Sequence, residues 1–117
     1  MQILGATGAW AGYFGGAIDD AYLYRLGEDD YVLVVNASNL AADVEHLRRH
    51  AGAFNVTVED HTASLAMIAF QGPLTGEVLE GLLEDGALPE PRRNALSRVK
   101  VAGAEVLLGR TGYTGEP

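Results

Sequence analysis

The 117-residue sequence contains no cysteine, and it has half as many basic as acidic side chains, eight against sixteen. The absence of cysteine excludes disulfides, thiolate nucleophiles and cysteine-ligated metals, and is consistent with a reducing compartment. The formal net charge of −8 disfavours binding to nucleic acid or to an anionic membrane surface, because both need clustered lysine and arginine.

Long apolar runs are also missing. No window approaches the ~18 consecutive apolar residues of a membrane span, and no basic segment of a signal peptide follows Met1. We therefore expect a cytoplasmic protein without membrane association. The hydrophobic fraction of 48% and the chain length fit one folded domain with a single core.

Glycine punctuates the beginning of the chain. Five glycines between residues 5 and 16 separate Trp10, Tyr13 and Phe14, and this spacing has neither a helical nor a strand period. Because glycine destabilises the interior of both elements, we expect a glycine-rich irregular arm over residues 1–18. Residues 19–117 are then expected to form a single domain, incomplete within this chain.

Regular elements are expected from residue 21 onward. Runs rich in Tyr, Leu and Val at 21–26 and 31–37 flank a polar turn and predict a hairpin. Asn39 is expected to be the N-cap of an amphipathic helix over 40–51, which Gly52 ends.

Two more strands and a second helix should follow. Residues 55–60 alternate like a half-buried strand, and the continuous apolar run at 65–70 is typical of a strand buried on both faces. Pro73 suits the first turn of a helix that would run to residue 82 or 83. Residues 84–96, with one glycine and two prolines, indicate a loop.

A final pair of strands is expected at 98–101 and 105–110, with a turn at 102–104. The expected order is strand, strand, helix, strand, strand, helix, strand, strand. Helices separated by hairpins favour an α+β fold with a largely antiparallel sheet and two helices.

Several polar side chains stand where chemistry is possible. Asp19 and Asp20 precede a strand, so one carboxylate can enter a pocket while the other faces solvent, although such pairs are more often solvated turns. Asn36 ends an apolar strand, where its amide either meets a ligand or ties its own turn. Tyr22 and Tyr24 share one strand face and form either an aromatic wall or plain core.

Metal binding and several catalytic motifs are disfavoured. His46 and His50 stand four apart on the expected helix, but no third ligand accompanies them, and Arg48 and Arg49 repel a cation. We expect a solvated helix face there and no metal site, and His61 is expected at the surface. The sequence lacks a P-loop, a G-x-G-x-x-G after a strand, a G-x-S-x-G elbow and a metal-type His–Glu cluster.

The last residues form a motif of their own. In R-T-G-Y-T-G-E at 110–116, two glycines flank a Tyr-Thr pair, so a tight turn can present a phenol and a carboxylate. A ligand-binding turn seldom stands at a natural chain end. We therefore expect this chain to be a piece of a longer protein.

Four blocks of this sequence together resemble one known family. G-G-A-I-D-D at 15–20, Y-V-L-V-V-N-A-S-N at 31–39, A-F-Q-G-P at 69–73 and R-T-G-Y-T-G-E at 110–116 occur in the order and approximate spacing of the T-protein, the aminomethyltransferase of the glycine cleavage system. The resemblance covers residues 15–116 and corresponds to an internal part of that family's folate-binding region.

This resemblance implies a transfer that uses tetrahydrofolate as co-substrate. An aminomethyl group on the lipoyl arm of the partner H-protein would give its methylene to tetrahydrofolate, with release of ammonia. Asp20 matches the family's carboxylate near folate N5 and N10, and would act as general base or as electrostatic stabiliser of the cationic iminium. Four further positions match family residues around the pterin or aminobenzoyl part of folate: Tyr24, Asn36, Glu105 and Tyr113. Arg110 is expected to brace the last turn.

Two alternatives share this architecture. One is a folate-dependent demethylase or the folate domain of a sarcosine- or dimethylglycine-oxidising enzyme, and the other is a non-catalytic folate-binding homologue. Asp20 together with the R-T-G-Y-T-G-E block favours the glycine-cleavage branch. Because family members are longer, we also expect unpaired sheet edges that promote self-association.

Overall fold

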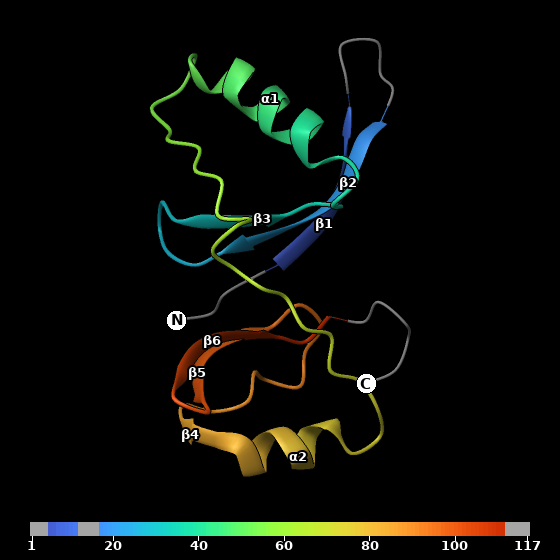
Figure 1. The fold of residues 1–117 in the computed structure, drawn as a ribbon, viewed down its shortest axis with the longest axis vertical. Coiled ribbons are helices and arrows are strands. Elements are labelled where there is room, and N and C mark those ends of the chain that lie inside the picture. The colour runs from blue at the N-terminus through green and yellow to red at the C-terminus, as the bar shows by residue number, and fades with distance from the viewer. Residues whose placement is uncertain (1–4, 12–16, 112–117) are drawn as a thin grey trace. The chain divides into compact units, whose positions relative to one another are not determined.

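The computed structural model describes residues 5–11 and 17–111 (Figure 1). Its elements are, in chain order, β1 (Gly5–Ala11), β2 (Ala17–Arg25), β3 (Tyr31–Val34), α1 (Leu40–Ala51), α2 (Thr75–Leu82), β4 (Leu83–Asp85), β5 (Leu96–Val101) and β6 (Ala104–Gly109). Two helices and antiparallel strand pairing confirm the predicted α+β class. The order differs from the prediction, because three strands precede the two helices and three follow them.

The chain divides into two compact units, and each is described separately. Thr7–Leu23 and Val32–Ile68 form what we call the N-terminal unit, whereas Tyr24–Tyr31 and Ala69–Pro117, with Met1–Ala6, form the C-terminal unit. The separation of a single domain over 19–117 from an arm over 1–18 remains a prediction.

The expected irregular arm contains a strand. Gly5–Ala11 forms β1, which is hydrogen-bonded beside β2 in a three-stranded sheet of order β1-β2-β3. A ladder partner supplies backbone hydrogen bonds that local composition cannot reveal, so the pairing outweighs the poor strand propensity of glycine.

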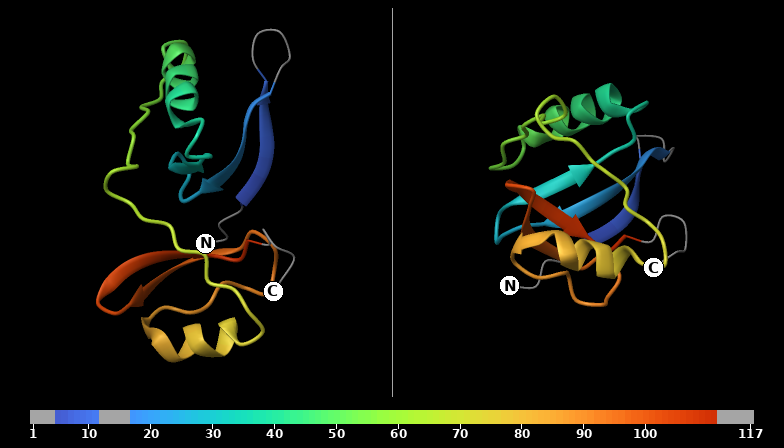
Figure 2. Two further views of the ribbon diagram at one scale, coloured as in Figure 1. Left: turned by 45° about the vertical axis from the view of Figure 1, so that its right-hand side comes forward. Right: turned by 60° about the horizontal axis from the view of Figure 1, so that its bottom comes forward.

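In β2, side chains alternate between the two faces of the sheet. Residues 19 and 21 are buried, whereas residue 20 between them is exposed, as the two-residue period of a strand requires. Helix α1 lies on one side of this sheet (Figures 1 and 2). The buried face of β2 therefore carries an aspartate, Asp19, next to a small apolar residue, Ala21.

Helix α1 spans the predicted residues, but its two ends differ in detail from the prediction. Its last turn holds Arg48, Arg49 and His50, and these cations suit the negative end of the helix dipole. Asn39 occupies the N-cap position, but its side chain makes no capping bond and donates to Asp19 instead. Gly52 follows the helix with a right-handed φ of −61°, so the helix ends without the left-handed turn that glycine often provides.

The strands predicted at 55–60 and 65–70 are wrong for this structure. Both segments lack regular secondary structure, and the apolar run is open to solvent, with Met67 82% and Ile68 85% exposed. A strand needs a neighbour that satisfies its backbone N–H and C=O groups, and no strand of the described residues pairs with this run. High strand propensity without a partner edge leaves the segment irregular and exposed.

The C-terminal unit combines α2 with a second three-stranded sheet of order β4-β5-β6. Figure 1 shows α2 running directly into β4, a short strand that begins where the predicted helix ends and extends into the predicted loop. Val101 and Ala104 are paired across β5 and β6, and Ala102 and Gly103 between them have positive φ values of 50° and 79°. Two positive φ values in a two-residue loop define the hairpin turn whose twist matches the strands.

A small core holds this unit together. Among the described residues of this unit, Leu26, Ala95 and Val99 are buried hydrophobic residues. Gly86 lies so close to β5 that a Cβ there would be 2.7 Å from the Arg98 carbonyl oxygen. The outer strands β1 and β3, and β4 and β6, are the edges of the two sheets. Self-association through such edges remains a prediction.

No helix in the described part of the chain is both long and apolar enough to cross a bilayer.

Candidate functional site

The carboxylate of Asp19 is the centre of a hydrogen-bond cluster in the N-terminal unit. Its Oδ1 accepts from Asn36 Nδ2 at 2.6 Å, from Asn39 Nδ2 at 3.0 Å and from the Asp20 backbone N–H at 2.8 Å. Its Oδ2 accepts from the Asn36 backbone N–H at 2.8 Å. Four donors around one carboxylate tie the beginning of β2 to the segment between β3 and α1.

These donors stabilise the ionised form of Asp19. The Asn36 side-chain hydrogen bond is the largest cause, and it holds the pKa of Asp19 well below its ordinary value of 3.8, although burial opposes the shift. The backbone N–H groups of Asn36 and Asp20 and the Asn39 amide lower the pKa further. Hydrogen bonds to a carboxylate favour its charged form, so Asp19 is a fixed negative charge at neutral pH.

Asp20, the predicted catalytic acid, lies on the opposite face of the strand. Its side chain is exposed, while its backbone is held on both sides. The N–H donates to Asp19, and the C=O accepts from Asn36 Nδ2 at 3.1 Å. The result is a solvent-accessible carboxylate on an immobilised backbone, which is the geometry that a group poised for a ligand requires.

The Asn36 amide does not tie its own turn. It donates to Asp19 and to the Asp20 carbonyl on β2, so it joins the segment after β3 to the beginning of β2. Its role as a folate ligand remains a prediction.

Two other predicted folate-binding positions, Tyr24 and Glu105, belong to the C-terminal unit. Tyr24 is half-buried, and its Oη would lie 3.8 Å from a Cβ added at Gly109. Glu105 is exposed on β6, paired with Lys100 on β5. Tyr113 lies outside the described residues. The structure thus brings Asp20 and Asn36 together within one unit, and the roles of all these positions remain predictions.

Arg110 contacts the loop that precedes β5, whereas most of the last turn, which it was expected to brace, lies outside the described residues. Its Nε donates to the Pro89 carbonyl at 3.0 Å. Its backbone N–H and C=O bond to Ala95 and Asn94 at 2.9 and 2.7 Å. The end of β6 is therefore fastened to the loop that precedes β5.

The ring centroids of His46 and His50 are 4.4 Å apart, and the rings are tilted by 41°. No group of three potential ligand side chains converges within the described residues, and the absence of a metal at this pair stays a prediction. His46 also lines a hollow of about 230 Å³ with Ile18, Ala42, Glu45 and Arg49. Opposite charges share its rim, since Glu45 and Arg49 form an exposed ion pair, so the hollow has no distinct preference for one class of ligand.

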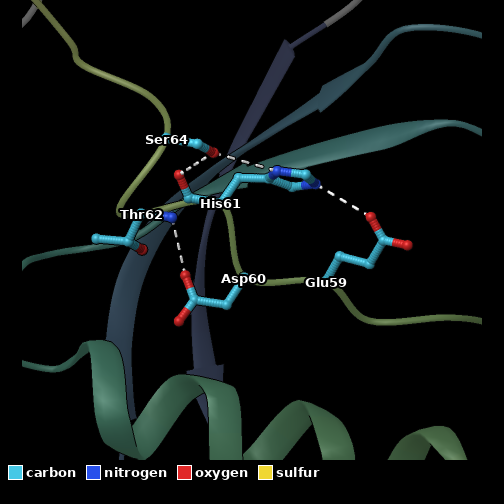
Figure 3. A network of polar contacts seen from close by, with 5 residues as sticks. All are labelled: Glu59, Asp60, His61, Thr62 and Ser64. Carbon is cyan, nitrogen blue, oxygen red and sulfur yellow. Dashed lines mark hydrogen bonds and ion pairs between the residues drawn. The ribbon is translucent and has the colours of Figure 1, made fainter.

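His61 lies in an exposed turn, as predicted, and Figure 3 shows its polar contacts. Nε2 is 3.1 Å from Glu59 Oε2, and Nδ1 is 3.4 Å from Ser64 Oγ. The Ser64 hydroxyl donates its proton to the His61 carbonyl at 3.0 Å, so this proton is directed to the backbone rather than to the ring. A serine nucleophile needs the reverse arrangement. The three residues stabilise a turn.

Comparison with protein families now places the chain in a class. Residues 7–117 match the family model described as the GCVT N-terminal domain. The match covers more than half of the chain, and the chain belongs to this family. The resemblance inferred from four sequence blocks is thereby confirmed.

Individual relatives carry a common name. The chain is 48% identical over 102 residues to an aminomethyltransferase of Thermus thermophilus, in an alignment that covers 87% of this chain and 29% of that protein. It is 43% identical over 102 residues to the aminomethyltransferase of Thermotoga maritima, covering 87% of this chain and 28% of that protein. The chain therefore spans less than a third of the length of these curated relatives.

Reasoning from sequence misses two members of the cluster. The sequence predicts a capping role for Asn39 and no role for Asp43, yet Asp43 is buried with only 2% of its surface exposed. One signal was available: three amide or carboxylate side chains, at 36, 39 and 43, lie within one stretch of eight residues where an apolar strand gives way to an amphipathic helix. Polar groups in such a place must find buried partners.

Proposed function

We propose that this chain is the tetrahydrofolate-binding part of an aminomethyltransferase of the glycine cleavage system, with Asp20 as its catalytic carboxylate. The name that the relatives share supports the activity, and one structural observation carries the assignment of Asp20. This carboxylate is exposed while both backbone polar groups of its residue are hydrogen-bonded within the Asp19 cluster.

A carboxylate in this position suits the chemistry of the proposed reaction. The methylene bound to the sulfur of the lipoyl arm forms a new bond to N5 of tetrahydrofolate, the carbon–sulfur bond breaks and leaves a thiol, and closure onto N10 releases ammonia. Positive charge develops at the iminium carbon and nitrogen. The Asp20 carboxylate can accept a proton from the folate nitrogen and stabilise this charge.

The remaining roles follow from the family resemblance. Tyr24, Asn36, Glu105 and Tyr113 are proposed to surround the folate rings, and lipoylated H-protein is proposed as the partner that delivers the aminomethyl group. A cytoplasmic location is part of the same proposal and fits the absence of cysteine.

Calorimetric titration of the chain with tetrahydrofolate tests the binding function. We expect saturable binding that weakens about tenfold or more in Asp20→Ala, because a charged hydrogen-bond partner is lost. Asp29→Ala is the matched control, since it removes the same charge from the exposed turn between β2 and β3, and it should leave affinity unchanged. A folded chain that shows no saturable binding, or equal losses in both variants, contradicts the proposal.

Turnover is tested separately. Aminomethylated H-protein and tetrahydrofolate are added to the chain and, in parallel, to a longer relative such as the Thermus thermophilus enzyme carrying the equivalent substitution. Release of ammonia that depends on the carboxylate supports the assigned role of Asp20. Full activity without the carboxylate contradicts it.

A further inference from the structure

Asp43 is a buried acid for which the proposed mechanism has no use. It stands in the first turn of α1 and is only 2% exposed. No described residue donates a hydrogen bond to either of its carboxyl oxygens. An ionised carboxylate that is buried without donors is strongly unfavourable, whereas a protonated carboxyl needs only an acceptor for its single proton.

The fold offers Asp19 as the acceptor. The Asp43 N–H donates to the Asn39 carbonyl at 3.0 Å, one helical turn earlier, and the Asn39 amide donates to Asp19, so Asp43 lies on the face of α1 that is directed at Asp19. Burial, followed by the Asp19 carboxylate, raises the pKa of Asp43. Asp19 already receives donors from two asparagine side chains and two backbone N–H groups. Two adjacent carboxyl groups do not both ionise readily. The four donors favour the charge on Asp19, so Asp43 is the carboxyl that keeps its proton to higher pH.

We propose that Asp43 is a positioning residue whose carboxyl proton is donated to Asp19, so that Asp19 holds Asn36 and the backbone of Asp20 in the arrangement of the active site. This inference rests on the proposed function in assigning the site to folate. The position of the proton is independent of that assignment.

Few charged groups face the Asp43 carboxyl. Asp19 on β2 opposes its ionisation, His46 on α1 favours it, and the neighbouring side chains of Asn36 and Asn39 are neutral. The amino-terminal end of α1 favours one negative charge nearby, which Asp19 already supplies. Asp20, also on β2, directs its side chain to the opposite, exposed face.

The sign of the pH effect follows. Because the pKa of Asp43 is raised in the folded state, its contribution to stability is complete below the unfolded value of 3.8 and is lost as the pH rises through the folded value. Ionisation then places a second negative charge against Asp19. The hydrogen bonds of Asp19 to Asn36 and Asp20 should loosen over the same pH range.

Carboxyl carbon-13 NMR of the whole chain locates the proton without any ligand. We expect Asp43 to titrate above 3.8 and Asp19 below it. In Asp19→Asn, the titration of Asp43 should move down because the neighbouring charge is gone, whereas Glu45→Gln, which removes an exposed charge on the same helix, should leave it unchanged. An Asp43 that titrates at or below 3.8 overturns the proposal.

The positioning role is tested by Asp43→Asn and Asp43→Ala. The amide keeps a neutral donor to Asp19, so Asp43→Asn should bind tetrahydrofolate more tightly than Asp43→Ala, by about tenfold for one hydrogen bond. Asp43→Asn should also lose the weakening of affinity that the wild type shows as Asp43 ionises. Equal losses in the two variants, or a wild-type pH profile in Asp43→Asn, contradict the role.

Two further results remain decisive. If Asp43→Ala does not fold, the pH profile of Asp43→Asn alone decides. If the folded wild type does not bind tetrahydrofolate, the proposed function fails, and the side-chain amide resonances of Asn36 replace affinity as the measurement. These should shift as Asp43 ionises in the wild type and stay constant in Asp43→Asn; an identical response in both overturns the inference.

Discussion

Replacement of Gly86 by alanine tests the packing of the C-terminal unit most directly. The φ of Gly86 is +85°, and a Cβ added there would lie 2.7 Å from the Arg98 carbonyl oxygen and 3.2 Å from Val99 Cγ1. The shortest of these approaches is to backbone that β5 holds within the sheet, so no side-chain rotation relieves it. The chain at this position therefore excludes any side chain.

The expected loss has two parts. A left-handed conformation disfavours an L side chain by about 1–2 kcal/mol, and overpacking against fixed neighbours adds about 1–3 kcal/mol. Gly86→Ala should thus lower the free energy of unfolding by roughly 2–5 kcal/mol.

Gly103 provides a matched control. Its φ is +79°, but no atom lies within 4 Å of a Cβ added there, so Gly103→Ala carries only the backbone part, about 1–2 kcal/mol. Both substitutions stiffen the unfolded chain equally, and both glycines lie in the same compact unit. The difference between them therefore isolates the close approach to β5.

Urea unfolding followed by circular dichroism measures both variants, with the slope of the transition checking that the unfolded state is unchanged. Equal losses for the two alanines, or a smaller loss at Gly86, would refute the close contact between Gly86 and the Arg98 backbone.

Four further substitutions have defined outcomes. Ala102→Asn should raise the thermal midpoint, with about 0.5 kcal/mol of added stability, because Ala102 has φ +50° in a turn that prefers Asn-Gly; a lower midpoint contradicts this turn assignment. Asp19 has a lowered pKa, so its contribution to stability is present above pH 3.8 and lost as the pH falls further; Asp19→Asn should unfold with a shallower acid dependence than the wild type in a pH series. Val99→Ala, at a position 4% exposed, should cost about 2 kcal/mol in urea unfolding, and a loss no larger than that of a surface variant would argue against this core. Glu45→Gln breaks an exposed ion pair with Arg49 and should change stability by about 0.5 kcal/mol or less at any salt concentration.

Sequence patterns over a few residues predicted the elements whose formation depends on interactions between residues close in the sequence. The apolar spacing of α1 and the turn between β5 and β6 are encoded within a few residues, and both elements form where they were expected. Cap chemistry was less reliable. Asn39 is a good N-cap by type, but a charged acceptor on another strand competes for its amide and binds it, as buried carboxylates do with any nearby donor.

The run at 65–70 failed because strand formation is not a local property. Its composition predicts a buried strand, yet burial and pairing require neighbouring surfaces, and the described residues leave Leu65 66% and Met67 82% exposed. The reverse holds for β1, whose glycines predicted no strand but which pairs with β2. In both cases, the presence or absence of a neighbouring strand edge, rather than the composition of the segment, determines whether a strand forms.

The orientation of the adjacent aspartates at the beginning of β2 depends both on a local sequence pattern and on partners that are distant in the sequence. Strand alternation dictates that Asp19 and Asp20 face opposite sides, but it does not dictate which of them faces inward. Ala21 is too small to mark the buried face by its hydropathy. The asparagines decide, because the Asn36 and Asn39 amides can satisfy a buried carboxylate only at position 19. With Asp19 turned inward and bound, Asp20 must face outward on a backbone that Asp19 and Asn36 both hold. Burial of the Asp19 carboxylate thus leaves the neighbouring Asp20 carboxylate exposed on a backbone that hydrogen bonds hold in place. A carboxylate that binds a ligand needs both properties.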